Sequence, residues 1–179
     1  GTRAMTARTP DAGPAAPPQD PWALLRRHTV ARIALGRVGA SMPTDALLRF
    51  GLAHAQARDA VHSALDTDAL EQALREQGFR PLQVASMAPD RESYLLRPDL
   101  GRRLHPDSRG MLEQAARADL ALVIADGLSA QAAQRHALPV ATLLRDALGG
   151  WPAPVVIARQ GRVALGDDIG AALGARLAV

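Results

Sequence analysis

The sequence predicts an α/β fold in which helices flank a mostly parallel sheet. Two segments, 120–125 and 153–159, are almost continuously apolar, as strands buried on both faces are. Helical patterns stand between and around these segments, and strands that alternate with helices indicate parallel pairing. We therefore expect a partial, Rossmann-like sheet, preceded in the chain by a small helical unit.

The composition is that of a packed protein with few aromatic residues. Hydrophobic residues make up 47% of the 179 residues and aromatic residues 3%, so Leu, Val, Ile and Ala must form the core. The sequence contains no Cys, and hence neither disulfides nor thiolate metal sites are expected. No apolar window is long enough to span a bilayer, and no secretory signal pattern is present. These features predict a soluble cytoplasmic protein.

The charge pattern argues against a nucleic-acid-binding protein. The isoelectric point is near 10.8 although the net charge is only +3, because every basic residue is Arg and none is Lys. Acidic residues are interspersed among these arginines, and few aromatic side chains could stack on bases. We expect neither nucleic acid nor a membrane as a partner.

The N-terminal part is predicted to hold a tail followed by helices. Residues 1–20 are rich in Pro, Ala and Gly and are expected to form a disordered tail. Asp20 and Pro21 suit the start of a first helix, which is expected to run to about Leu35. Thr44 is the expected cap of a second helix.

Two further helical patterns complete this helical unit. Apolar residues recur at spacings of three and four over 47–64, and His54, which lies among them, is expected to be a hydrogen-bonded core histidine. A third helix is expected to be capped by Asp66 or Asp68 and to end at Gly78.

The helical unit is expected to span residues 21–78 and the α/β domain residues 79–179. The chain order expected in the second domain is a β-like segment 81–88, an extended segment 92–104, a helix 106–118, the strand 120–125, a helix from about 130, another helix over 139–147, the strand 153–159, a helix 167–175 capped by Asp167, and the start of a further strand at 176–179.

The turn after the first buried strand has two interpretations. Asp126 and Gly127 end the strand, and Ser129 precedes a helix. In parallel sheets, ligands bind beyond the carboxyl ends of the strands, where helix N-termini also point. The plainer interpretation is that Ser129 caps the helix and Asp126 accepts hydrogen bonds from nearby amides. The motif alone favours the plainer interpretation, in which Ser129 is a helix cap.

An arginine-rich turn places Arg97, Arg102 and Arg103 around Asp99 and Gly101. Such clusters recognise phosphate or carboxylate groups, or they form internal ion pairs or subunit contacts. We expect this turn to lie at a subunit contact.

No complete catalytic or metal-binding constellation is visible. The five His residues stand apart, and the sequence has no nucleophile elbow, dinucleotide-binding glycine motif or phosphate loop. We predict neither catalytic residues nor metal ligands in this chain. Val163 falls in the loop between the strand 153–159 and the next helix, where it could provide an apolar wall for a ligand.

Five stretches, in this order, resemble the small (light) subunit of ethanolamine ammonia-lyase. They are "HTVARIALGRVG" (28–39), "FGLAHAQARDAVH" (50–62), "LLRPDLGRRL" (95–104), "VIADGLSA" (123–130) and "ARQGRVALGDDIGAALGAR" (158–176). The resemblance implies an enzyme that converts ethanolamine to acetaldehyde and ammonia with adenosylcobalamin. It also implies a TIM-barrel large subunit that binds the substrate, a hetero-oligomer, and a cobalamin cavity that the small subunit closes on one side.

Within this resemblance, Val163 matches a position that touches adenosylcobalamin. The two other such positions in the family, a Glu in a "GERPG"-type turn and a later Cys, lie beyond Val179. The chain is therefore expected to lack the family's C-terminal portion, to bind cobalamin weakly by itself, and to be inactive alone. A DxHxxG motif is absent, which implies that the cofactor keeps its own dimethylbenzimidazole on cobalt. The implied location is the cytoplasm, either free or inside a bacterial microcompartment.

The alternative is a non-catalytic α/β binding module. In it, Arg97, Arg102 and Arg103 would recognise an anionic ligand or a protein partner. A cobalamin titration with and without the large subunit distinguishes the two hypotheses.

Overall fold

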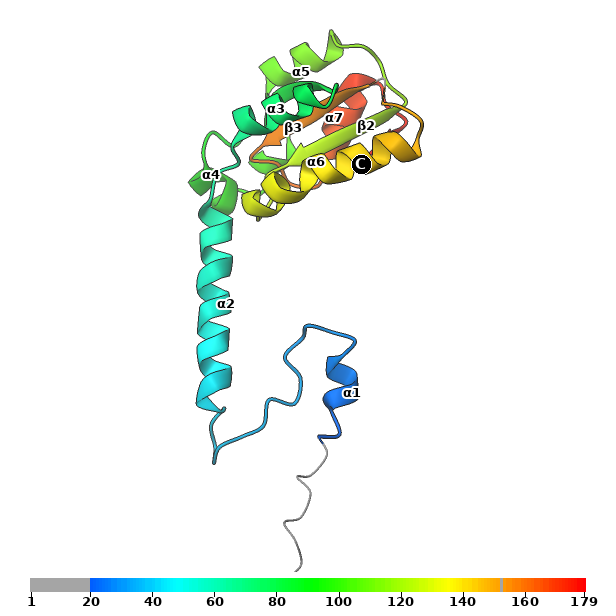
Figure 1. Ribbon diagram of the computed structural model, residues 1–179. Helices are drawn as coiled ribbons and strands as arrows, with labels where there is room; N and C mark the ends of the chain where they lie inside the picture. The colour runs from blue at the N-terminus through cyan, green and yellow to red at the C-terminus, as the bar shows by residue number, and fades with distance from the viewer. Residues whose placement is uncertain (1–19, 152) are drawn as a thin grey trace, which may run out of the picture. The chain divides into compact units, whose positions relative to one another are not determined.

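The computed structural model describes residues 20–151 and 153–179 (Figure 1). The chain forms two compact units, which meet in the sequence between Gly51 and Leu52. The tail predicted at residues 1–20 lies outside the described residues except for Asp20. Helix α2 (Thr44–His62) carries the chain across the division.

The first unit contains little regular structure. Helix α1 (Ala23–Arg26) is a single turn, whereas the sequence predicts a helix that runs to about Leu35. Ala34 and Gly36 have φ angles of 50° and 79°, and left-handed residues cannot continue a helix. Among the described residues of this unit only Ala46 is buried, so no packed layer stabilises the predicted helix.

Helix α2 forms where its apolar spacing predicts it, but its side chains are not buried as expected. Thr44 is the first residue of the helix instead of its cap. His54 is exposed, so its prediction as a core histidine is wrong. Apolar spacing predicts a helix correctly, whereas burial needs a second layer of side chains, which spacing does not supply.

The second unit alternates helices and strands. Its elements are α3 (Thr67–Glu76), β1 (Arg80–Ala85), α4 (Arg91–Leu96), η1 (Leu100–Arg102), α5 (Pro106–Glu113), β2 (Leu120–Ala125), α6 (Ala130–Ala147), β3 (Pro154–Arg159), α7 (Leu165–Leu173) and β4 (Leu177–Ala178).

The four strands form one parallel sheet in the order β1-β3-β2-β4. Val156 of β3 lies opposite Leu82 of β1 on one side and Val123 of β2 on the other. The strand expected at 176–179 is β4, which pairs with β2 through Leu177 and Leu120. The predicted class, an α/β fold with a parallel sheet flanked by helices, is confirmed.

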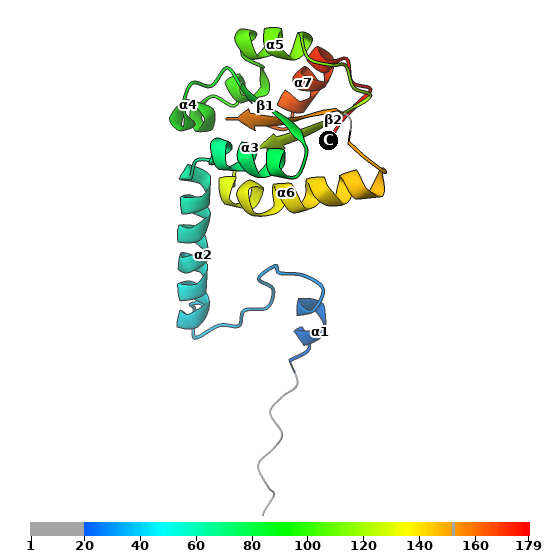
Figure 2. The ribbon, with the colours of Figure 1, turned by 45° about the horizontal axis from the view of Figure 1, so that its top comes forward.

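Helices cover both faces of this sheet (Figure 2). Helices α3 and α6 pack on one face, and α5 and α7 pack on the other. The connection from β2 back to β3 runs through α6, whereas those from β1 to β2 and from β3 to β4 run through α5 and α7. This distribution is required when every crossover has the same hand and the chain reverses its direction across the sheet.

Helix α3 packs directly on the sheet. Leu70 and Leu74 are buried in the same cluster as Val155 and Ile157 of β3. Asp66 caps the helix by accepting a hydrogen bond from the Ala69 amide at 3.0 Å, as predicted. The division after Gly51 therefore differs from the predicted boundary at residue 78, because the third helix packs on strands that follow it.

The segment 92–104 is not extended as predicted. Asp90 accepts a hydrogen bond from the Ser93 amide at 2.7 Å and starts α4, and the short helix η1 follows. Tyr94 of α4 is completely buried, so tertiary packing stabilises a helix that the local sequence only weakly favours.

Two predictions about helix ends and continuity are also wrong. The two helices expected after residue 130 are one helix, α6, with Pro139 inside it. Proline removes one intrahelical hydrogen bond, but Ala137, Leu138 and Ala141 continue the packed face across it. Asp167 lies in the first turn of α7 and does not cap it, because the helix already begins at Leu165.

Candidate functional site

The loop between β3 and α7 lies at the carboxyl end of the sheet. At this end the chain leaves β2 toward α6 on one face and leaves β3 toward α7 on the other. Adjacent strands whose connections diverge in this way define the usual ligand-binding position of a parallel sheet. Val163 lies in this loop, and its side chain is 99% exposed.

Asp126 holds the start of this loop against the end of β2. Its carboxylate accepts hydrogen bonds from the amides of Gln160 at 3.0 Å and Gly161 at 3.1 Å. Asp126 is only 4% exposed, so these bonds satisfy a buried charge. The interpretation in which Asp126 accepts from nearby amides is therefore confirmed.

Arg91 supplies the positive charge beside this carboxylate. Its Nη1 lies 3.6 Å from Asp126 Oδ2, and both side chains are largely buried. The same guanidinium donates to the carbonyls of Val61 at 2.6 Å and Gly127 at 2.8 Å, and to Gln160 Oε1 at 3.3 Å. A buried ion pair is tolerated when its remaining hydrogen-bonding groups are satisfied in this way.

Tyr94 packs beneath the loop between two arginines. The guanidinium carbons of Arg91 and Arg162 lie 4.5 and 4.1 Å from its ring centroid. Its hydroxyl donates to the Gly161 carbonyl at 3.4 Å, and burial raises the pKa of this hydroxyl. The cation–π contacts and the hydrogen bond join α4 to the loop that carries Val163.

Arg162 and Gly101 fit closely under the same loop. Arg162 donates from Nη2 to the Tyr94 carbonyl at 3.0 Å and from its amide to the Gly101 carbonyl at 2.8 Å. A Cβ atom on Gly101 would lie 2.9 Å from Arg162 Cγ and 3.2 Å from the Gln160 carbonyl oxygen. Only glycine allows this approach.

Gln160 itself has an unusual backbone conformation. Its φ angle is 55°, which is uncommon for a residue other than glycine. Its amide is bound by Asp126, and its carbonyl accepts from Ser86 Oγ at 2.7 Å. These bonds stabilise a tight turn that presents Val163 to solvent.

An apolar cavity of about 410 Å³ lies next to Val163. It opens at the carboxyl end of β2 and beside β4. Its lining includes Val123, Ala125, Val163, Leu165, Asp167 and Val179. Arg162 also lines it, so the cavity offers an apolar wall with one carboxylate and one guanidinium.

The other predicted site residues lie outside this cavity. Ser129 caps α6 by accepting a hydrogen bond from the Ala132 amide at 3.2 Å, as the plainer interpretation predicts. Arg97 binds Asp99 through two hydrogen bonds of 2.9 and 2.7 Å, and this contact lowers the pKa of Asp99. Arg102 and Arg103 are exposed.

Asp168 attaches α7 to the arginine-rich turn. Its Oδ2 accepts from the Leu104 amide at 2.9 Å, and its Oδ1 lies 2.9 Å from Arg109 Nη2. The Leu104 hydrogen bond, followed by the contacts with Arg109, holds the pKa of Asp168 below its ordinary value. This contact fixes the helix that follows the Val163 loop.

Sequence reasoning missed the residues that support the loop. Arg91, Tyr94 and Arg162 are not among the predicted site residues, although the dipeptide Gln160-Gly161 signals a tight turn. Their partners are 30 or more positions away in the chain, so no local pattern could reveal them.

Within the described ranges, no group of three His, Cys, Asp or Glu side chains is placed to hold a metal ion. Over the same part of the chain, no helix has the length and apolarity needed to cross a membrane.

The fold and this loop define a class: a parallel α/β domain that presents a fixed apolar side chain beside an apolar cavity at the carboxyl end of its sheet. The family model described as Ethanolamine ammonia-lyase light chain (EutC) matches residues 19–179, and the chain belongs to this family.

Curated relatives agree with this assignment. The chain is 53% identical over 169 residues to the ethanolamine ammonia-lyase small subunit of Azotobacter vinelandii. It is 54% identical over 170 residues to that of Pseudomonas putida and 52% identical over 174 residues to that of Pseudomonas fluorescens. These matches cover 90–93% of this chain but 62–64% of the relatives, so the chain spans about three-fifths of their length.

Proposed function

We propose that this chain forms part of the small subunit of an adenosylcobalamin-dependent ethanolamine ammonia-lyase, which converts ethanolamine to acetaldehyde and ammonia. In this proposal a large TIM-barrel subunit binds the substrate, and the Val163 loop forms one side of the cobalamin cavity between the subunits. The observation that carries the proposal is the exposure of Val163. Its side chain is 99% exposed, on a loop that hydrogen bonds of Asp126, Tyr94 and Arg162 hold in place.

The residues around Val163 fit one face of a large, mostly apolar ring system with amide substituents. Val123, Ala125 and Leu165 provide an apolar surface, and Asp167 could accept a hydrogen bond from an amide. When bound, adenosylcobalamin supplies the radical chemistry of the reaction through cleavage of its cobalt–carbon bond. Since the described lining of the cavity carries one carboxylate and one guanidinium, and a guanidinium stays protonated, we assign proton transfer to the large subunit.

The role of this chain is then to shape and close the cavity. The Val163 side chain excludes water from one side, and the hydrogen bonds of Gln160 and Gly161 keep it in place. A single valine contributes about 1–2 kcal/mol by apolar burial, whereas micromolar affinity needs about 8 kcal/mol. We therefore propose that the chain alone binds cobalamin weakly and is inactive without the large subunit.

The alternative, an anion-binding module built on the arginine-rich turn, has less support. Arg97 is already neutralised by Asp99, and Arg102 and Arg103 are exposed. We propose that Arg102 instead contributes to a subunit contact. We place the assembled enzyme in the cytoplasm, either free or inside a bacterial microcompartment.

Replacement of Val163 by Asp tests the proposal. In the complex with the large subunit, Val163→Asp puts a charge against the cofactor, so we expect at least about tenfold weaker cobalamin retention, measured by absorbance after gel filtration. The matched control is Val140→Asp, at a valine of α6 that is 50% exposed. Equal cobalamin retention by the Val163→Asp and wild-type complexes would contradict the proposed role of the loop.

A further inference from the structure

The first unit, residues 20–51, exposes an unusual amount of apolar surface. Nine large apolar side chains are about half or more exposed: Trp22, Leu24, Leu25, Val30, Val38, Met42, Leu47, Leu48 and Phe50. Only Ala46 is buried among the described residues of this unit. A segment without a core cannot offset the entropy of ordering its backbone, so its stable conformation requires a partner surface.

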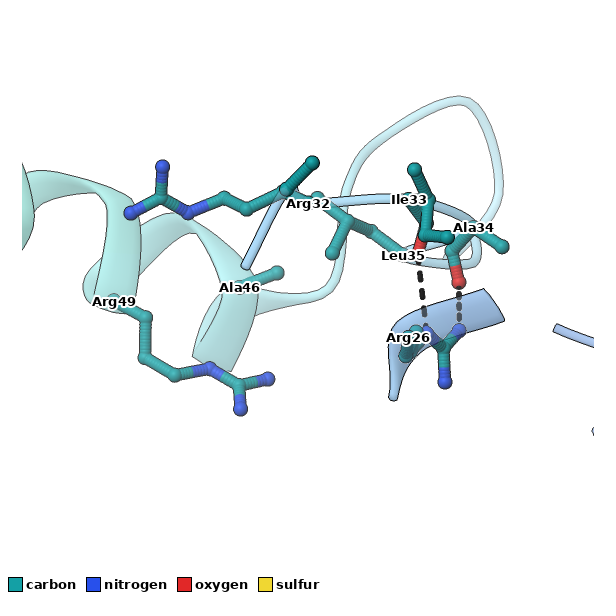
Figure 3. Close-up of a pocket in the computed structure, with 8 residues that line it drawn as sticks. Arg26, Arg32, Ile33, Ala34, Leu35, Ala46 and Arg49 are labelled. Atoms are coloured by element: carbon teal, nitrogen blue, oxygen red, sulfur yellow. Dashed lines mark hydrogen bonds between the residues drawn. The ribbon is translucent and has the colours of Figure 1, made fainter. Parts of the chain in front are cut away.

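Some local contacts nevertheless order part of this segment before any partner binds. Figure 3 shows the Arg26 guanidinium donating to the carbonyls of Ile33 and Ala34. The same guanidinium pairs with Asp20. These bonds hold the turn at Ala34, where φ is 50°, and they leave a cavity of about 380 Å³ whose lining includes Leu35 and Arg32. The segment thus offers a shaped surface to a partner.

The charges of this unit indicate the chemistry of that partner. Asp20 and Asp45 are paired with Arg26 and Arg49. The three other arginines of the described residues 20–51, at positions 27, 32 and 37, have no carboxylate within ion-pair distance among the described residues; Arg32 instead lies over the Phe50 ring. Two copies of such a surface repel each other, whereas an apolar surface with carboxylates at its rim is complementary to it.

The apolar side chains at the start of α2 share one side of the helix. Successive helical residues project about 100° apart, so Leu47, Leu48 and Phe50 fall within an arc of about 160°, and Asp45 and Arg49 project on the opposite side. A helix of this kind can dock its apolar side into a groove of a partner protein.

We infer that residues 20–51 form a docking arm that binds an apolar, acid-rimmed surface of another protein chain. The inference rests on the proposed function, in which that chain is the large subunit. The arm and the Val163 loop would then be separate contacts, one for assembly and the other for the cofactor.

Hydrogen exchange of the full chain tests the arm. We expect amides 20–51 to exchange rapidly in the free chain and to be protected when the large subunit is added. Protection in the dilute free chain, protection that rises with chain concentration, or protection by phosphatidylglycerol vesicles alone would assign the arm to its own chain, a second copy or a membrane. Each of these results would overturn the inference.

Paired variants show which side chains contribute. Leu48→Ser and Arg37→Glu should each weaken association with the large subunit at least about tenfold. Leu143→Ser and Arg135→Glu are matched controls, since Leu143 is 69% and Leu48 67% exposed and Arg135 is also an exposed arginine. In all four variants the second unit, residues 52–179, should unfold at the same thermal midpoint as in the wild-type chain.

The docking-arm inference and the proposed function can be refuted separately. If the complex forms but residues 20–51 stay unprotected and the arm variants associate normally, the arm is wrong and the proposed function stands. If the wild-type chain does not associate with the large subunit at all, the proposed function and the stated occupant of the arm are both wrong.

Discussion

Asp126→Ala removes the carboxylate that joins the end of β2 to the Val163 loop. The amides of Gln160 and Gly161 lose acceptors at 3.0 and 3.1 Å, and Arg91 loses the charge 3.6 Å from its Nη1. Each unsatisfied buried amide costs about 1–3 kcal/mol, and breaking a buried ion pair costs about 3–5 kcal/mol in total. Because these effects overlap, we expect a loss of about 3–5 kcal/mol in the free energy of unfolding.

Urea unfolding monitored by circular dichroism measures this loss. With an m-value of about 2 kcal/mol/M, the midpoint should fall by about 2 M. Asp126→Asn keeps one acceptor oxygen and should lose about half as much, so it provides a folded variant if the alanine variant does not fold. The control is Asp146→Ala, because Asp146 forms an exposed pair with Arg145 and its loss should cost less than about 1 kcal/mol.

The reasoning fails if Asp126→Ala costs no more than Asp146→Ala. A double-mutant cycle with Arg91→Ala separates the ion pair from the amide contacts, and a coupling of about 1–3 kcal/mol is expected. Zero coupling would mean that Arg91 does not compensate the Asp126 charge.

Further predictions concern the supports of the loop and the arginine-rich turn. Gly101→Ala should lower the free energy of unfolding by about 1–3 kcal/mol, because its Cβ would meet backbone and side-chain atoms within 3.2 Å; an unchanged urea midpoint would contradict this. The pKa of Asp168 is lowered in the folded state, so its contribution is present above about pH 4 and is lost as the pH falls further. Asp168→Asn should therefore flatten the acid side of the stability profile, and an unchanged slope in urea unfolding from about pH 7 to pH 3 would refute the contact with Leu104. Arg102→Glu should weaken co-purification with the large subunit, whereas Arg135→Glu, at an exposed position of α6, should not.

Local sequence determined the two buried strands of the second unit and two of its helix caps. The segments 120–125 and 153–159 form buried parallel strands because they are apolar on both faces. Asp66 and Ser129 cap helices because a side-chain oxygen next to the first helical turn reaches its free amides without any help from distant residues. Val163 could be placed in the loop after a strand because the apolar segment 153–159, which precedes it, is recognisable from local sequence alone.

Tertiary structure alone decided how that loop is held and what is buried. Asp126 meets Gln160 from 34 positions away, and Tyr94 meets Gly161 from 67 positions away, so these bonds exist only after the sheet has formed. His54 and Leu47 have the spacing of a buried helix face and are nevertheless exposed. Apolar spacing states which side chains can be buried together, whereas burial itself requires a covering layer, and for residues 20–51 the described chain does not contain one within that unit.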